Sequence, residues 1–155
     1  MRDEGGELGR LNGQTGRRAD RQRASFRQQL LWKKAQAFAT TIADVVVALP
    51  RDRASNLMAD QLLRAATSIP ANIAEGYGRY SQAAYRNHLS IARGSAFECE
   101  SWLDMPLRRG LVSEAMFSEL LAACDELESL LTLRMKSLSQ GKTYAVREEG
   151  EPYEV

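Results

Sequence analysis

Hydrophobic residues recur at steps of three and four through the middle of this chain, which is the spacing of one face of an α-helix. The first such stretch is stopped by Pro50, because a proline ring cannot continue a helix. Its apolar positions are Leu31, Ala35, Phe38, Ile42, Val45 and Leu49. The pattern predicts an amphipathic helix that buries this face.

A second stretch begins near Ser55, which is a suitable N-cap residue. It should end near Gly76 and Gly78, since glycine tolerates the backbone reversal that many helix ends require. The apolar face of this expected helix contains Met58, Leu62, Ala65, Ile69 and Ile73.

Two further helices are expected, one from Ser81 to Gly110 and one opening at Ser113. Pro106 falls in the last turn of the earlier one or just past it. Their apolar faces contain Tyr85, Leu89, Ala92, Ala96, Cys99 and Leu103, then Phe117, Leu120, Cys124, Leu127, Leu131, Met135 and Leu138. No alternating Val- or Ile-rich segment indicates a sheet. The sequence therefore predicts an all-α fold, an up-down-up-down antiparallel four-helix bundle over residues 25–140 with disordered termini.

The two ends differ from the body in composition. Residues 1–24 hold five glycines and few apolar side chains, so we expect a disordered Arg-rich arm. Residues 141–155 carry four Glu against one Lys and one Arg, and we expect an acidic flexible tail. The net charge of the whole chain is only +1.

The basic arm is a candidate nucleic-acid contact, to RNA or DNA. Arginines can neutralise phosphates and release condensed counterions, which gives an affinity that falls with salt. The candidate residues are Arg17, Arg18, Arg21, Arg23 and Arg27. Charged termini also serve simply to keep a protein soluble, and that alternative stays open.

Cys99 and Cys124 lie in periodic apolar segments without metal-type spacing, so we expect buried free thiols in a reducing cytoplasm. No apolar run approaches the length of a membrane span, and no signal peptide opens the chain. We therefore expect a cytoplasmic protein with no membrane contact.

The second helix carries a polar stripe beside its apolar face. At 100° per residue, Gln61, Arg64, Ser68, Asn72, Glu75 and Arg79 share one sector. A buried polar stripe needs partners, and either a pair between Arg64 and Glu75 or a bond from Asn72 to neighbouring backbone could supply them. Pro70 lies within the same helix and should kink it.

The stripe lies in a segment that resembles the four-helix-bundle proteins encoded in intervening sequences of ribosomal RNA genes. The resemblance rests on residues 63–66, on Ser68-Ile-Pro-Ala-Asn-Ile-Ala-Glu-Gly76 and on Gly78-Arg79. It continues in residues 89–95, then at Glu98 and Glu100, and spans about residues 30–138. The arm, Met105-Pro106 and the tail depart from the family pattern.

This resemblance implies a homo-oligomer, because relatives of this fold assemble as rings, commonly pentamers. A distant branch serves as the accessory protein of diversity-generating retroelements and contacts a reverse transcriptase and RNA. Mid-helix Gly94 and Ser95 weaken a helix, so we expect them to permit a close helix or subunit approach. The candidate motif and interface residues are Arg64, Ser68, Pro70, Asn72, Glu75, Gly76, Arg79, Gly94, Ser95 and Glu98.

No catalytic residue, metal site or cofactor is predicted. His88 is the only histidine, and its place beside Tyr85 and Ala92 favours a packed or half-buried ring over a general base. Glu98 and Glu100 are two residues apart and point to different sides of a helix.

The sequence therefore favours a non-enzymatic homo-oligomeric scaffold for RNA or an RNA-processing partner, with a reverse transcriptase as one concrete partner. A pure protein-interaction module without nucleic-acid contact is the first alternative. An enzyme of unrecognised type is the second.

Overall fold

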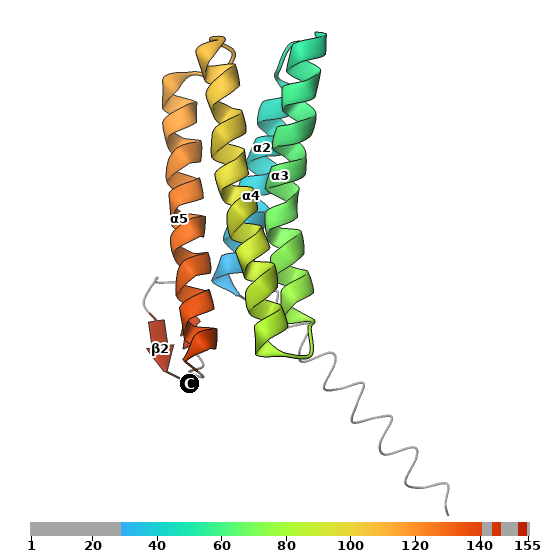
Figure 1. Ribbon diagram of the computed structural model, residues 1–155. Coiled ribbons are helices and arrows are strands. Elements are labelled where there is room, and N and C mark those ends of the chain that lie inside the picture. The colour runs from blue at the N-terminus through green and yellow to red at the C-terminus, as the bar shows by residue number, and fades with distance from the viewer. Residues whose placement is uncertain (1–28, 141–143, 147–151, 155) are drawn as a thin grey trace, which may run out of the picture.

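Four long helices pack side by side in an antiparallel bundle (Figure 1). The computed structural model describes residues 29–140, 144–146 and 152–154. The helices are α2 Leu30–Val47, α3 Arg53–Tyr77, α4 Gln82–Arg108 and α5 Glu114–Ser139. In chain order each packs on the next, and α5 returns to α2. The predicted all-α architecture is confirmed, whereas the arm residues Arg17, Arg18, Arg21, Arg23 and Arg27 lie outside the described residues.

The core lies between the four predicted apolar faces. Its fully buried side chains include residues of every helix, among them Ala35, Ile42, Leu62, Ala65, Ile69, Ile73, Leu89, Ala92, Ala96, Cys99, Leu103, Cys124 and Leu131. Four positions differ from the prediction, since Val45, Phe117, Met135 and Leu138 are only partly buried and pack against this core. Leu49 is buried although α2 ends at Val47, two residues before it.

The first residue of α3 is capped by Asp52, so the expected cap at Ser55 was wrong. The Asp52 carboxylate accepts hydrogen bonds from the backbone N–H groups of Ala54 and Ser55, each at 3.0 Å. The Ser55 hydroxyl also donates to it at 2.7 Å. These bonds from Ser55, first the backbone and then the side chain, lower the pKa of Asp52. Asp52 has the extended backbone conformation of an N-cap residue, whereas Ser55 already lies within the first turn of α3.

The other predicted helix boundaries agree with the structure. The Ser81 and Ser113 hydroxyls accept bonds from Ala84 N at 3.2 Å and Met116 N at 3.1 Å, which makes both serines N-caps. After α4, Gly110 adopts φ +66°, and its N–H bonds to Leu107 O at 2.8 Å. This left-handed residue is the position where a helix end requires glycine.

The end of α3 does not need glycine for that reason. Gly78 is its C-cap with φ −77°, a right-handed conformation open to any residue, and Gly76 lies inside the helix. The expected role of both glycines in a backbone reversal was therefore wrong.

Both helix prolines are buried within continuous helices. Pro70 lies inside α3, which Figure 1 draws as one unbroken helix through this point. Pro106 lies inside α4, two residues before its end. Pro70 therefore does not end α3, and the kink expected there stays a prediction.

Beyond α5 the chain forms a short antiparallel ribbon that the hydrophobic pattern did not predict. Strand β1 Tyr144–Val146 pairs with β2 Pro152–Glu154, with Ala145 opposite Tyr153. Of the helices that the structure describes, none combines the length and apolar character required to cross a bilayer.

Candidate functional site

Helices α3 and α4 are in close contact at Gly76, near the end where they are joined. A Cβ atom on Gly76 would lie 2.7 Å from His88 Cβ and 2.8 Å from Tyr85 Cδ2. It would also lie 3.2 Å from the Tyr85 carbonyl oxygen, which belongs to the backbone. Only glycine therefore lets α4 lie this close to α3, and the contact places His88 against the polar stripe.

His88 occupies the centre of a hydrogen-bonded chain between the two helices. Arg79 Nε donates to His88 Nε2 at 3.1 Å, so Nε2 must be the unprotonated nitrogen of the ring. The proton is then on Nδ1, which donates to Asn72 Oδ1 at 3.1 Å. Arg79 also forms an ion pair with Glu75, one turn earlier on α3. Both ring nitrogens are occupied, as expected for a structural histidine.

The chain of bonds continues towards the middle of the bundle. Asn72 Nδ2 donates to the backbone oxygen of Ser68 at 2.9 Å and to its hydroxyl at 3.0 Å. The Ser95 hydroxyl on α4 lies 3.0 Å from Ser68 Oγ and 3.1 Å from Ile91 O, two acceptors for its proton. We call Ser68, Asn72, Glu75, Arg79, His88 and Ser95 the polar network.

The structure places Arg64 with Glu98 on α4, so the pairing expected between Arg64 and Glu75 was wrong. Arg64 Nη2 contacts Glu98 Oε1, and its Nε and Nη2 donate to Gln61 Oε1 at 3.2 and 3.0 Å. Trp102 Nε1 donates to the same Glu98 oxygen at 3.4 Å. Glu75 lies about three helical turns further along α3, too far for Arg64 to reach.

The polar stripe is not buried as a whole: its charged residues are exposed, whereas Gln61, Ser68 and Asn72 are half-buried. The Arg64 side chain is 60% exposed, and Glu75 and Arg79 are about half exposed. Ser95 alone among the stripe and network residues belongs to the buried class. The Glu98 side chain, the partner of Arg64 on α4, is 33% exposed.

Gly94 lies on the exposed side of α4, beside the contact between α3 and α4. A Cβ atom added there would meet nothing within 4 Å, so no contact within the described residues requires glycine. Ile91 and Met105, on the same side of α4, are each 46% exposed. The close helix approach expected at Gly94 is therefore absent from the described part of the chain, and the expected subunit approach stays a prediction.

A carboxyl pair between α4 and α5 was missed in the sequence because its members are 28 positions apart. Burial and the neighbouring Glu100 raise the pKa of Glu128 to about 7, against the opposing effect of Arg93. Burial and Asp125 also raise the pKa of Glu100, while a hydrogen bond with Glu128 lowers it. Glu128 Oε1 is buried without a hydrogen-bond partner among the described residues. Burial and the repulsion between the two carboxylates therefore favour the protonated form of Glu128.

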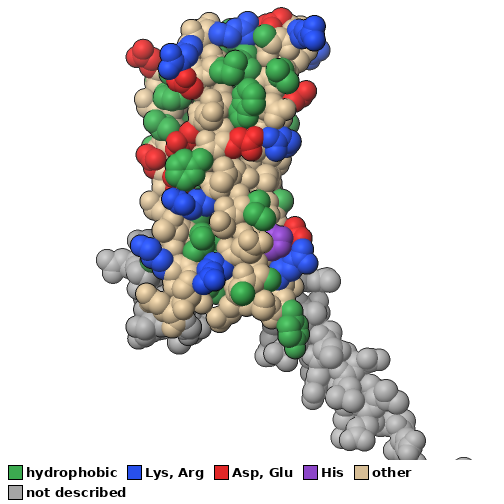
Figure 2. Space-filling view, viewed as in Figure 1, with side chains coloured by type: hydrophobic (Ala, Val, Ile, Leu, Met, Phe, Trp, Pro, Cys, Tyr) green, Lys and Arg blue, Asp and Glu red, His purple; other side chains and the backbone are tan. Residues whose placement is uncertain are grey.

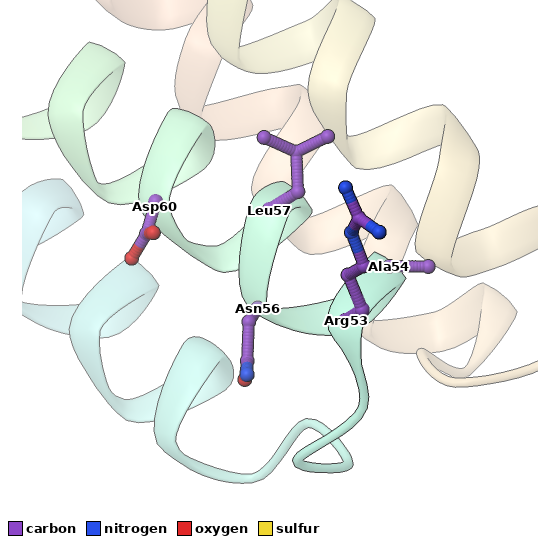
Figure 3. A pocket seen from close by; sticks show the side chains of 5 residues that line it. All are labelled: Arg53, Ala54, Asn56, Leu57 and Asp60. Atoms are coloured by element: carbon purple, nitrogen blue, oxygen red, sulfur yellow. The ribbon is translucent and has the colours of Figure 1, made fainter.

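Other reactive groups are not assembled into a catalytic constellation in the described residues. Cys99 and Cys124 are free and buried, as predicted, and burial raises the pKa of both thiols, that of Cys99 to about 12. A surface hollow of about 780 Å³ lies at the start of α3. Figure 3 shows that its lining side chains diverge, with Leu57 and Arg53 pointing away from Asn56 and Asp60.

The fold and the contact between α3 and α4 define the class of protein. It is an antiparallel four-helix bundle in which the polar network joins α3 to α4. The sequence model of the 23S rRNA-intervening sequence protein family matches residues 27–133. The chain belongs to this family.

A solved structure from Bacteroides thetaiotaomicron is similar to this chain. It is described as a protein of unknown function from the S23 ribosomal protein family. The two are 30% identical, the match covers 69% of this chain and 99% of that one, and the TM-score is 0.65. No curated protein matches the sequence.

Proposed function

We propose that this protein is a non-enzymatic homo-oligomeric scaffold that holds RNA, or a protein acting on RNA, on an assembly of helical bundles. The ring, commonly a pentamer, is the form that the family resemblance implies. A reverse transcriptase is one partner consistent with the same resemblance. The surface of α4 around Gly94 carries the assembly part of this proposal.

The physical support for a subunit contact is the free-energy cost of having Gly94 inside α4. A glycine inside a helix destabilises it by about 1 kcal/mol relative to alanine. Within the described residues no neighbouring atom explains that cost. Ile91 and Met105 expose apolar surface on the same side, and a second helix approaching Gly94 would cover both. A subunit contact gives the glycine the role that it lacks within one chain.

The geometry of the described residues favours a scaffold over an enzyme. His88 uses both ring nitrogens in the polar network, and the two thiols are buried with raised pKa values. A general base or nucleophile needs a free lone pair beside a substrate cleft. These groups instead hold the helices together.

Native mass spectrometry tests the assembly. Gly94→Leu should fold with an unchanged helical spectrum, since the added side chain enters open space, and should reduce the oligomer to monomers. Ala122→Leu is the matched control, because Ala122 is an exposed alanine on α5. If the oligomer mass of Gly94→Leu is unchanged, the face of α4 around Gly94 is not the assembly surface.

Measurement of RNA binding tests the second part of the proposal, that the assembly holds RNA. Replacing Arg17, Arg18, Arg21, Arg23 and Arg27 by Gln should weaken binding of single-stranded RNA and flatten its salt dependence. If wild-type protein assembles but binds no RNA at low salt, the protein-interaction alternative replaces the RNA scaffold.

A further inference from the structure

The antiparallel fold sorts the charges of a neutral body into two oppositely charged halves. One end of the bundle consists of the eleven residues of each helix nearest the α3–α4 connection: residues 30–40, 67–77, 82–92 and 129–139. With the connection at 78–81, we call this the basic end. It carries one acidic residue, Glu75. Its basic residues are Lys33, Lys34, Arg79, Arg86, Arg134 and Lys136.

The rest of the bundle has the opposite balance. Residues 41–66 and 93–128 carry six Lys and Arg against eleven Asp and Glu. The described body is therefore +5 at one end and −5 at the other, although its total is zero. Figure 2 shows Lys and Arg side chains at both ends of the bundle, mixed with acidic side chains at the upper end, whereas at the lower end an acidic side chain lies beside the histidine.

The basic side chains of this end come from three of the four helices that meet there and from the α3–α4 connection. Lys33, Arg79, Arg86 and Lys136 are exposed, and they lie on α2, on the α3–α4 connection, on α4 and on α5. Arg86 Nη1 donates to Ser139 Oγ at 2.8 Å, which links α4 to the end of α5. Arg134 lies over the ring of Tyr85, 5.5 Å from its centroid. The surface is thus one end of the molecule and not a stripe along one helix.

We infer that the basic end binds the phosphate backbone of RNA, and this inference rests on the proposed function. Positive charge concentrated on about three helical turns attracts a polyanion and places phosphates against Lys and Arg. The chain enters α2 and leaves α5 at this end, so the Arg-rich residues 1–28 and the Glu-rich residues 141–155 are both joined covalently to the same surface. The acidic half repels RNA, so the bundle binds it end-on.

Two matched triple variants of the full-length chain test the inference. Lys33→Gln, Arg86→Gln and Lys136→Gln remove three charges from the basic end. Arg51→Gln, Arg53→Gln and Arg108→Gln remove three exposed charges from the other end and give the same net charge. The probe is a fluorescent single-stranded oligouridylate, titrated between about 50 and 200 mM salt.

Each lost phosphate contact on single-stranded RNA should lower the slope of log K against log salt by about 0.7. The basic-end variant should therefore lose about 2 from the slope and bind about 100-fold more weakly at 0.1 M salt. The control variant should keep the wild-type slope. Lys33→Arg, Arg86→Lys and Lys136→Arg together should restore binding, since they keep the charge.

Three outcomes would overturn the inference. If wild type binds RNA and the two Gln variants weaken it equally, net charge and not the basic end carries the affinity. If RNA binding is lost only on replacing the arm arginines, the scaffold proposal stands and this inference fails. If the basic-end variant instead loses concentration-dependent self-association, that end binds the acidic half of a second copy.

Discussion

Replacing Gly76 by alanine should destabilise the fold, although alanine is the better helix former. The substitution gains about 1 kcal/mol of helix propensity. Against that, the new methyl group would sit 2.7 Å from His88 Cβ and 2.8 Å from Tyr85 Cδ2. Because Tyr85 O is also only 3.2 Å away, the backbone of α4 has to move. Such overpacking costs about 1–3 kcal/mol.

The balance is a net loss of about 1–2 kcal/mol, because moving α4 also stretches the bonds of His88 to Asn72 and Arg79. For a domain of this size each kcal/mol lowers the melting temperature by about 2–4 °C. Thermal melts followed by circular dichroism, at one fixed protein concentration, should therefore give a Tm about 2–8 °C below wild type.

Gly78→Ala is the matched control for this experiment. Gly78 is two residues further on, and a Cβ atom there would meet only ordinary contacts at 3.4 and 3.8 Å. Its melting temperature should stay close to wild type. A Gly76→Ala protein that melts at or above the wild-type temperature would refute the close-approach reasoning, since propensity would then outweigh the clash.

Three further predictions concern Arg64, Glu128 and Asp52. Arg64→Ala should lower the unfolding free energy by less than about 1 kcal/mol, because the ion pair of Arg64 with Glu98 is exposed. A loss of several kcal/mol in urea unfolding would contradict this. Glu128→Gln should stabilise the protein by about 1 kcal/mol at pH 8 and not at pH 4. The reason is that the surroundings that raise the pKa of this carboxyl destabilise only its ionised form. Equal Tm shifts at both pH values would contradict this. Asp52→Asn should lower Tm above about pH 4, where the carboxylate is ionised in both the folded and the unfolded state. Because folding lowers the pKa of Asp52, the difference should shrink progressively as the pH falls from about 4 through that lowered pKa; a pH-independent difference in Tm would count against this.

The sequence by itself determined the helices and their buried faces. Steps of three and four place Leu62, Ile69 and Ile73 on one side of α3 whatever the neighbours are, because helical geometry is local. Helix boundaries are less certain from sequence, since Asp52 and Ser55 both suit an N-cap and only the backbone conformation selects one.

Only the tertiary structure decided the partners of the polar residues and the distribution of charge. Arg64 meets Glu98 and not Glu75 because α4 is closer to its side chain than three turns of its own helix. Gly76 and Gly94 look alike in sequence, yet one faces a crowded helix and the other open space. Likewise the neutral charge count of the body conceals two charged ends, which exist because antiparallel packing brings residues far apart in sequence to the same end of the bundle.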